Sequence, residues 1–329
     1  MLTHVLPSLA KVRLPGRSIS SAALAGLITC LGAQEPPAAA AEGLPQKTAR
    51  NPSLLETAGQ ISRWNDRAKP VKIAGPLYFV GTRGLGAWLI ETSHGFILLN
   101  TGMPKSGPMI EASTRELGKD PSQIKGILAC HAHMDHVGGH AYIQSLSGAK
   151  VVVMDREAEI LKNGGKGEPH YGRRLLLRYD RVRAELVEPL KDKGTVVLGS
   201  ITLTAHLTPG HSIGATTWAM EIKEGGRTLK VVFPDGTGVN PGFRLGSSPS
   251  YPGIVDDYVR TFQILESFDP DIWLPPHLDA FDFEEKLARV PKEGVAVWKE
   301  GYEDWVAAQK KKFEDALTKA TAKETGVLK

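Results

Sequence analysis

The strongest constraint on this chain is a short segment that concentrates metal-binding side chains. It reads His131-Ala-His133-Met-Asp135-His136, and His140 follows shortly after it. Side chains two positions apart in an extended segment point to the same side, so His131 and His133 can bind one ion together. In a helix the same two residues would lie about 200° apart. The spacing therefore predicts a metal site on an extended segment of the chain.

Candidate ligands elsewhere in the chain also follow short apolar runs. Three residues share this placement: His211, Asp235 and His277. Loops at one edge of a folded sheet carry most binding residues, so ligands far apart in the sequence can meet there. Proline and glycine before His211 and His277 fix turns, which also have a purely structural use.

The candidate ligands divide into two sets. One set supplies three imidazoles and leaves open the fourth position of a tetrahedral zinc, as in catalytic sites: His131, His133 and His211. The other can hold a second ion: Asp135, His136 and His277. Imidazoles with one carboxylate suit Zn²⁺ better than Mg²⁺ or Ca²⁺. The two sets predict two Zn²⁺ ions, and zinc lowers the pKa of a bound water to about 7, so hydroxide is available as a nucleophile at neutral pH. Asp135 lies between His133 of the first set and His136 of the second in the sequence, and it is expected to be catalytic, by orienting this nucleophile.

The other histidines lack this local spacing. They are interpreted as polar surface residues, with a supporting or pocket role as the alternative for the last three: His4, His94, His140, His170 and His206. Cys130 points away from His131 in an extended segment. It is therefore interpreted as a small buried strand residue and not as a ligand.

The N-terminal segment has the three-region pattern of an export signal. A basic stretch ends at Arg17, and the uncharged apolar run 19–31 that follows is too short to span a membrane comfortably. We expect residues 1–33 to be removed, which places the mature protein in the periplasm or outside the cell. An uncleaved N-terminal tail is the alternative, and Thr29 before Cys30 disfavours a lipid anchor.

Removal of this segment leaves a chain of nearly balanced charge. The sequence carries 40 Lys and Arg against 36 Asp and Glu, and three of the basic residues lie in residues 1–33. A basic nucleic-acid footprint is therefore absent. Cys130 would be the single remaining cysteine, so a mature monomer has no internal disulfide, and core packing and metal must hold the fold.

Apolar runs punctuated by glycine predict both strands and helices. Strands are expected at 76–80, 87–91, 95–99, 124–130, 151–154, 195–207 (as a pair), 216–222, 229–233 and 272–274. Helices are expected at 105–117, 137–146, 155–161, 256–267 and 297–321. The mixture in both halves predicts two sheets with helices outside, in one domain of residues 61–325 behind a loosely ordered lead-in, 34–60.

Six motifs stand out: Gly81–Leu85, Ile97–Gly102, Ala129–Gly139, Asn163–Lys166, Leu207–His211, and Tyr251–Gly253 with Pro276-His277. Together they resemble the metallo-β-lactamase superfamily, and most closely the third subclass of class B β-lactamases. The likeness runs from about residue 64 to the C-terminal helix. It implies an exported enzyme with an αββα sandwich of two mixed sheets (α/β class), with helices on both outer faces and two zinc ions. It also implies that the first zinc binds His131, His133 and His211, and the second Asp135, His136 and His277.

The chain departs from this pattern at three places. Asn100 stands where many superfamily members carry Asp. Gly236 stands where this subclass usually has Ser, which supports a water at the second zinc and helps hold the substrate carboxylate; Thr237 is a candidate substitute. Residues 233–235 are also similar to an element of thioesterase and lactonase relatives whose Asp bridges both metals. In the lactamase interpretation, Asp235 is instead a supporting residue.

The resemblance implies a zinc-dependent hydrolase, an antibiotic-resistance enzyme that opens the β-lactam ring of penicillins, cephalosporins or carbapenems by attack of zinc-bound hydroxide. A lactonase or thioesterase on the same scaffold is the first alternative, and a non-catalytic periplasmic zinc-binding protein is the second. We expect a monomer with a small-molecule substrate, without nucleic acid and, in the mature form, without a membrane. Substrate contacts are expected from the loops 163–175 and 236–250.

Overall fold

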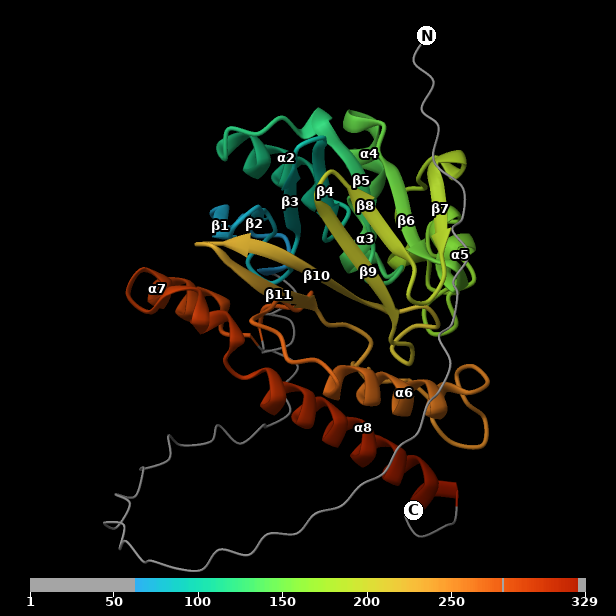
Figure 1. Cartoon of the computed structure of the whole chain (residues 1–329). Helices are drawn as coiled ribbons and strands as arrows, with labels where there is room; N and C mark the ends of the chain where they lie inside the picture. Colours follow the sequence, from blue (N-terminus) through green and yellow to red (C-terminus); the bar gives the residue numbers. More distant parts are fainter. Residues whose placement is uncertain (1–62, 280, 325–329) are drawn as a thin grey trace, which may run out of the picture. The chain divides into compact units, whose positions relative to one another are not determined.

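Two β-sheets form the centre of the fold. The computed structural model describes residues 63–279 and 281–324. The first sheet has the strand order β1-β2-β3-β4-β5-β6-β7, and the second has the order β12-β11-β10-β9-β8. Helices lie outside both sheets (Figure 1), so the predicted αββα sandwich of the α/β class is confirmed.

The first sheet changes from antiparallel to parallel pairing at β4. Its strands are β1 (Val71–Ala74), β2 (Leu77–Phe79), β3 (Trp88–Thr92), β4 (Gly95–Leu99), β5 (Ile124–Leu128), β6 (Lys150–Met154) and β7 (Val187–Leu190). Neighbours from β1 to β4 are antiparallel, and neighbours from β4 to β7 are parallel. The carboxyl ends of β4, β5 and β6 therefore lie at the same edge of the sheet, where β5 leads into His131.

The second sheet is an antiparallel meander with one parallel strand added. Its strands are β8 (Thr195–Leu198), β9 (Ile201–Leu207), β10 (Thr216–Glu224), β11 (Arg227–Phe233) and β12 (Ile272–Trp273). Gly225 and Gly226 turn β10 into β11 with φ of +55° and +79°, which glycine adopts without steric strain. The strands predicted at 216–222 and 229–233 therefore form an antiparallel hairpin, and β12 pairs parallel to β11.

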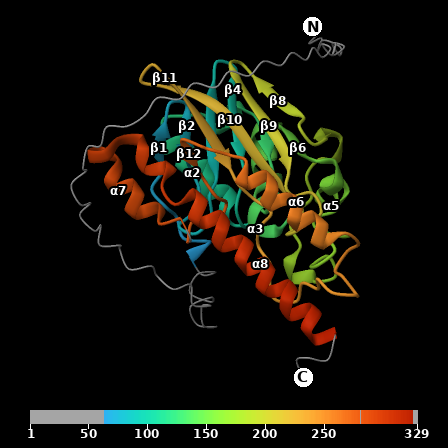
Figure 2. The same cartoon turned by 60° about the horizontal axis from the view of Figure 1, so that its bottom comes forward.

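Helices cover both outer faces. They are α2 (Ser106–Glu116), α3 (Met134–Val137), α4 (His140–Ser147), α5 (Ala158–Lys162), α6 (Ile254–Glu266), α7 (Phe283–Glu293) and α8 (Tyr302–Glu324), with a 3₁₀ segment η5 (Gly294–Lys299) between the last two. Ile110 of α2, Ile143 of α4 and Leu161 of α5 pack in one hydrophobic cluster with the first sheet. Figures 1 and 2 both show α6 beside α8, on the side of the second sheet.

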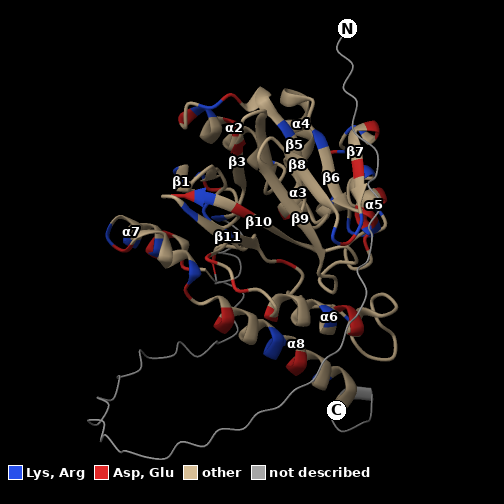
Figure 3. Ribbon diagram, viewed as in Figure 1, with Lys and Arg blue, Asp and Glu red and all other residues tan. Residues whose placement is uncertain are grey.

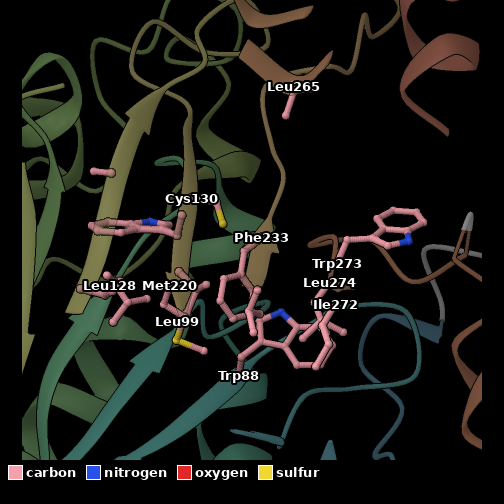
Figure 4. Close-up of a cluster of buried hydrophobic side chains, with 14 of the residues drawn as sticks. Trp88, Leu99, Leu128, Cys130, Met220, Phe233, Leu265, Ile272, Trp273 and Leu274 are labelled. Carbon is pink, nitrogen blue, oxygen red and sulfur yellow. The ribbon is translucent and has the colours of Figure 1, made fainter. Parts of the chain in front are cut away.

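Alternation along the strands separates two cores. Leu98 of β4 belongs to the cluster under the outer helices, whereas Leu99 belongs to the cluster between the sheets. Successive side chains of a strand point to opposite faces, which explains this division. Figure 4 shows Trp88 and Leu99 of the first sheet near Phe233 of the second. The rings of Trp88 and Phe233 have centroids 6.2 Å apart, so large aromatic side chains join the sheets.

Two predicted helix boundaries are wrong. The helix expected at 137–146 is divided: α3 contains Asp135 and His136, and α4 starts at His140 after Gly138-Gly139. A Cβ on Gly138 would lie 2.4 Å from Pro104 N, so close backbone packing requires glycine there. The helix expected at 297–321 starts only after Gly301, whose φ of +76° separates η5 from α8.

The predicted export signal 1–33 and lead-in 34–60 lie outside the described residues. No helix in the part of the chain that the structure describes is long and apolar enough to cross a membrane.

Candidate metal centre

The predicted ligands come from loops of both sheets that meet at one edge of the sandwich. His131 and His133 follow β5, His211 lies between β9 and β10, and His277 follows β12. Hydrogen bonds fix this meeting point, since Thr216 N donates to Cys130 O at 2.7 Å and Trp218 Nε1 donates to Ala129 O at 3.0 Å.

Three histidines form the first group. The ligand atoms of His131, His133 and His211 lie within 4.8 Å of one another, and all three side chains are buried. His133 Nδ1 and His211 Nε2 are 3.2 Å apart. A tetrahedral zinc with Zn–N bonds of about 2.0–2.1 Å places its ligand atoms about 3.3–3.4 Å apart. The observed spacing therefore fits one ion between these rings.

The second nitrogen of each of these rings faces an oxygen. His131 Nδ1 lies 2.6 Å from Asp235 Oδ2, and His211 Nδ1 lies 2.7 Å from Gly238 O. His133 Nε2 lies 3.3 Å from Glu168 Oε1. Such partners orient a metal-binding imidazole and fix its tautomer. They leave His131 Nε2, His133 Nδ1 and His211 Nε2 for an ion.

The second group surrounds Asp135. Its Oδ2 atom lies 3.2 Å from His136 Nε2 and 3.4 Å from His277 Nε2. His131, Asp135 and His136 also have ligand atoms within 4.8 Å of one another. The rings of His136 and His277 have centroids 4.8 Å apart. The structure thus brings all six predicted ligands together, with His277 attached to the group through Asp135.

The protonation states of His131, His211 and Asp135 suit metal ligands, whereas His133 and His277 must lose a proton to bind metal. Burial lowers the pKa of these two rings, but Glu168 beside His133 and Asp135 beside His277 raise it overall. Burial, with the neighbouring imidazoles, holds the pKa of His131 and of His211 well below the usual value, so both rings are neutral at pH 7. Burial alone would raise the pKa of Asp135, but His136 and His277 hold it well below its usual value. Neutral imidazoles and an ionised carboxylate are the forms that bind metal.

Unpartnered nitrogens provide a further test of the fit. Among the described residues, the buried Nε2 atoms of His131 and His136 have no hydrogen-bond partner, although His136 Nε2 lies 3.2 Å from Asp135 Oδ2. Buried polar atoms are normally satisfied, and each exception requires an explanation. A cation between these rings supplies one, and the imidazole-rich donor set fits Zn²⁺.

The backbone at Gly236 leaves no room for the serine that the third subclass of class B β-lactamases usually has at this position. Its φ is +95°, and a Cβ there would lie 1.9 Å from Thr208 O. Thr237 beside it lines the cleft and is 8% exposed. Asn100 also has a positive φ, of +61°. Its amide accepts from Cys130 N at 3.0 Å and contacts Cys130 Sγ at 3.2 Å, so it shapes the strand end before His131.

The histidines outside the two groups have different environments. His94 is exposed, as predicted. His140 is fully buried, and its Nδ1 lies 2.7 Å from Thr101 Oγ1, so its interpretation as a surface residue is wrong. His170 stacks on Phe243 with ring centroids 3.4 Å apart. Cys130 is buried, as expected. His4 lies outside the described residues.

Sequence reasoning missed the groups that hold the ligand loops. Glu157 is fully buried, and it accepts from Ala132 N at 2.5 Å and from Gly214 N at 3.3 Å. Tyr179 OH donates to Ala132 O at 2.9 Å. Both backbone polar groups of Ala132, between His131 and His133, are therefore held by hydrogen bonds. Burial raises the pKa of Glu157 to about 6. An acidic residue in a short helical segment gives no signal of this role.

A cleft of about 660 Å³ opens over both groups. It is lined by five of the six predicted ligands, all but the buried His136, and by residues of several loops and of α8, among them Trp64, Met103, Tyr171, Leu177, Thr237, Asn240, Trp305, Gln309 and Lys312. The loops 163–175 and 236–250, which are predicted to contact the substrate, both reach the cleft, through Tyr171 and Asn240. A cleft of this volume fits a small organic molecule.

Comparisons with known proteins agree with this geometry. The native FEZ-1 metallo-β-lactamase from Legionella gormanii is 36% identical to the chain, with a TM-score of 0.74 over 78% of this chain and 98% of that chain. BJP-1, a subclass B3 metallo-β-lactamase of Bradyrhizobium japonicum, is 34% identical, with a TM-score of 0.74 over 80% and 98%. MEM-A1, a subclass B3 metallo-β-lactamase from a soil metagenome library, is 32% identical, with a TM-score of 0.73 over 79% and 99%.

The sequence model of the metallo-β-lactamase superfamily matches residues 86–277, which include all six predicted ligands. The resemblance seen in the motifs is therefore confirmed. This fold with its histidine-rich site is that of a metal-dependent hydrolase. The chain belongs to the metallo-β-lactamase superfamily.

Proposed function

We propose that this protein is a zinc-dependent β-lactamase that opens the four-membered ring of penicillins, cephalosporins or carbapenems. The observation that carries the proposal is the meeting of six side chains in two groups, with five of these side chains lining one cleft. The similarity to three enzymes named metallo-β-lactamases, at 32–36% identity, supports it.

Two zinc ions are part of the proposal. The first would be held by His131, His133 and His211, and the second by Asp135, His136 and His277. Bound zinc supplies Lewis-acid activation of water and of the lactam carbonyl at neutral pH.

The protein's own groups provide position and proton transfer. Asp235 and Glu168 hold the rings of His131 and His133, so the ligand nitrogens keep their direction during the reaction. Asp135 stays ionised at neutral pH and stands between the two histidine groups. Its carboxylate can orient the attacking water and accept its proton. Fixed groups of this kind act without reorganisation when the reaction occurs.

The contact between Asp235 and His131 bears on the alternative hydrolases. A carboxylate that bridges two ions must face both of them, whereas Asp235 Oδ2 lies 2.6 Å from Nδ1, the ring nitrogen of His131 directed away from the ligand group. This geometry favours the supporting role of Asp235 and, with it, the lactamase over the lactonase or thioesterase. A cleft open above the ligands also favours catalysis over simple zinc storage.

The direct test measures metal content together with activity. Zinc-loaded protein is assayed with a chromogenic cephalosporin, a penicillin and a carbapenem, while zinc is counted by elemental analysis. We expect turnover with two zinc ions per chain, and a loss of kcat of at least about 100-fold in Asp135→Asn. Full zinc loading without hydrolysis of any of the three compounds would sink the proposal. Export of the chain, its monomeric state and the 61–325 domain bounds stay predictions.

A further inference from the structure

The charges that line the cleft are unevenly distributed. Among the described residues that line it, Lys312 of α8 is the one lysine or arginine. The acidic side chains there lie within the metal centre or beside it: Asp135, Glu168, Asp235 and Asp279. A negatively charged substrate that enters this cleft therefore meets one permanently positive side chain besides any bound metal.

Lys312 differs from the two lysines that precede it. Lys310 Nζ pairs with Glu266 Oε1 at 2.6 Å, and Lys311 Nζ pairs with Asp315 Oδ1 at 3.1 Å. Lys312 has neither an ion pair nor a hydrogen bond within the described ranges 63–279 and 281–324. Figure 3 shows both acidic and basic residues along α8. Lys319 of the same helix also has no ion pair or hydrogen bond among the described residues, but it does not line the cleft, whereas Lys312 does.

The helix presents Lys312 on a defined face. Trp305, Gln309 and Lys312 follow one another at spacings of four and three residues, which places them on one side of a helix. All three line the cleft. The adjacent face is anchored in the core, because Phe313 is 3% exposed and stacks on Tyr258 with ring centroids 4.8 Å apart.

This anchor connects α8 to the metal centre. Tyr258 OH donates to Gly238 O at 2.7 Å, and the same carbonyl lies 2.7 Å from His211 Nδ1. Lys312 is therefore carried on a helix whose position is coupled to a ligand of the first group. Helix α8 also lies outside residues 86–277, the part of the chain that matches the superfamily model.

We propose that Lys312 binds the carboxylate of the substrate. This inference rests on the proposed function, because penicillins, cephalosporins and carbapenems all carry a carboxylate on the ring fused or attached to the lactam. Lys312 is an exposed side chain that lines the cleft, and its ammonium group, which no carboxylate neutralises among the described residues, attracts such an anion. Lys312 thereby favours anionic over neutral substrates and does not take part in bond breaking.

The test compares a penicillin with its own methyl ester, using zinc-loaded full-length protein. Lys312→Gln is expected to raise the KM for the acid about fivefold, or about 1 kcal/mol, with kcat within about twofold. The KM for the ester is expected to stay at the wild-type value, because the ester has no charge for Lys312 to bind. Lys312→Arg is expected to keep most of the affinity for the acid.

Lys311→Gln is the matched control. It removes the same charge one residue away, from an exposed side chain that already pairs with Asp315 and does not line the cleft. We expect wild-type KM values for both compounds. An unchanged KM for the acid in Lys312→Gln, or an equal rise for acid and ester, overturns the inference.

A binding measurement separates this inference from the proposed function. If wild-type protein hydrolyses no β-lactam, calorimetric titration of the zinc-loaded protein with benzylpenicillin and its methyl ester still tests Lys312. Tighter binding of the acid than of the ester, lost in Lys312→Gln, supports the role of Lys312 although the hydrolase proposal fails. No preference for the acid in wild-type protein contradicts both.

Discussion

At the residue scale, the metal centre depends on a carboxylate outside the ligand set. Glu157 accepts hydrogen bonds from Ala132 N, between His131 and His133, and from Gly214 N in the loop of His211. It therefore connects two loops that arrive from different sheets. A glutamine amide has one acceptor oxygen, so it can satisfy only one of these two N–H groups and places its NH₂ against the other.

We therefore expect Glu157→Gln to lower zinc affinity at the first group by roughly 10- to 100-fold, the usual effect of losing a group that orients metal ligands. The measurement is competition with a chromophoric chelator. Glu159→Gln is the control, because Glu159 is exposed and its carboxylate pairs with Lys162, at 2.9 Å. Wild-type zinc affinity in Glu157→Gln would show that the two loops hold their positions without this carboxylate.

Gly236 gives a second prediction at this scale. Gly236→Ser places a Cβ 1.9 Å from Thr208 O at a φ of +95°, so the backbone of the loop after β11 must move. We expect the free energy of unfolding to fall by roughly 3 kcal/mol, measured by urea denaturation. Gly226→Ala is the control, since it shares a positive φ, of +79°, but meets no atom within 4 Å. Equal losses of unfolding free energy in the two variants would show that the positive φ alone causes the effect.

At the scale of elements, α8 is held by aromatic packing. Phe313 stacks on Tyr258 and on Phe262 of α6, with ring centroids 4.8 and 5.8 Å apart. Both partners are buried. The position of the cleft wall formed by α8 therefore depends on a few aromatic contacts between α6 and α8.

Phe313→Ala is expected to lower the free energy of unfolding by about 3–5 kcal/mol, as for other buried phenylalanines truncated to alanine. Glu314→Ala, an exposed neighbour on the same helix, should change it by no more than about 0.5 kcal/mol. Chemical denaturation of both variants makes the comparison. A loss below about 1 kcal/mol in Phe313→Ala would mean that α8 is held mainly by other contacts.

The strands and helices also show which parts of the fold can be predicted from the sequence. Runs with clear period or glycine punctuation, such as 95–99, 105–117 and 256–267, formed the predicted strand and helices. The strand β7 was missed because Pro189 and Glu188 interrupt its apolar pattern, which suits an edge strand only. The helix α7 was missed because most of its residues are charged and it contains Pro291.

The site was more predictable in its ligands than in their supports. The pattern of His131, His133, Asp135 and His136 can be recognised because one short segment carries four donors. Glu157 and Tyr179 act through contacts made only after β6 and the 163–182 segment pack against the ligand loop. No local spacing encodes such contacts, so sequence reasoning could not assign them.

At the scale of the whole molecule, the metal centre joins the two sheets. His131 and His133 follow a strand of the first sheet, whereas His211 and His277 follow strands of the second. A metal ion bound by residues of both sheets would hold the edges of the sandwich together. Without it, buried imidazole nitrogens of His131 and His136 stay unsatisfied.

Removal of metal is therefore expected to destabilise the whole fold. A ligand that binds only the native state adds about 4 kcal/mol when its concentration is 1,000 times Kd. We expect Tm to fall after dialysis against a chelator and to recover when zinc is returned. Protein dialysed against chelator-free buffer is the control. A Tm indifferent to zinc would show that core packing alone holds the sheets.

Cys130 lies at this same junction, with 1% of its side chain exposed. Its sulfur faces the space between the sheets, which a bulky electrophile cannot enter while the sandwich is closed. Alkylation of this thiol therefore requires a transient separation of the two sheets. The rate at which the tryptic peptide containing Cys130 is alkylated thus reports how often the two sheets separate in the native protein. Bound zinc is expected to lower that rate.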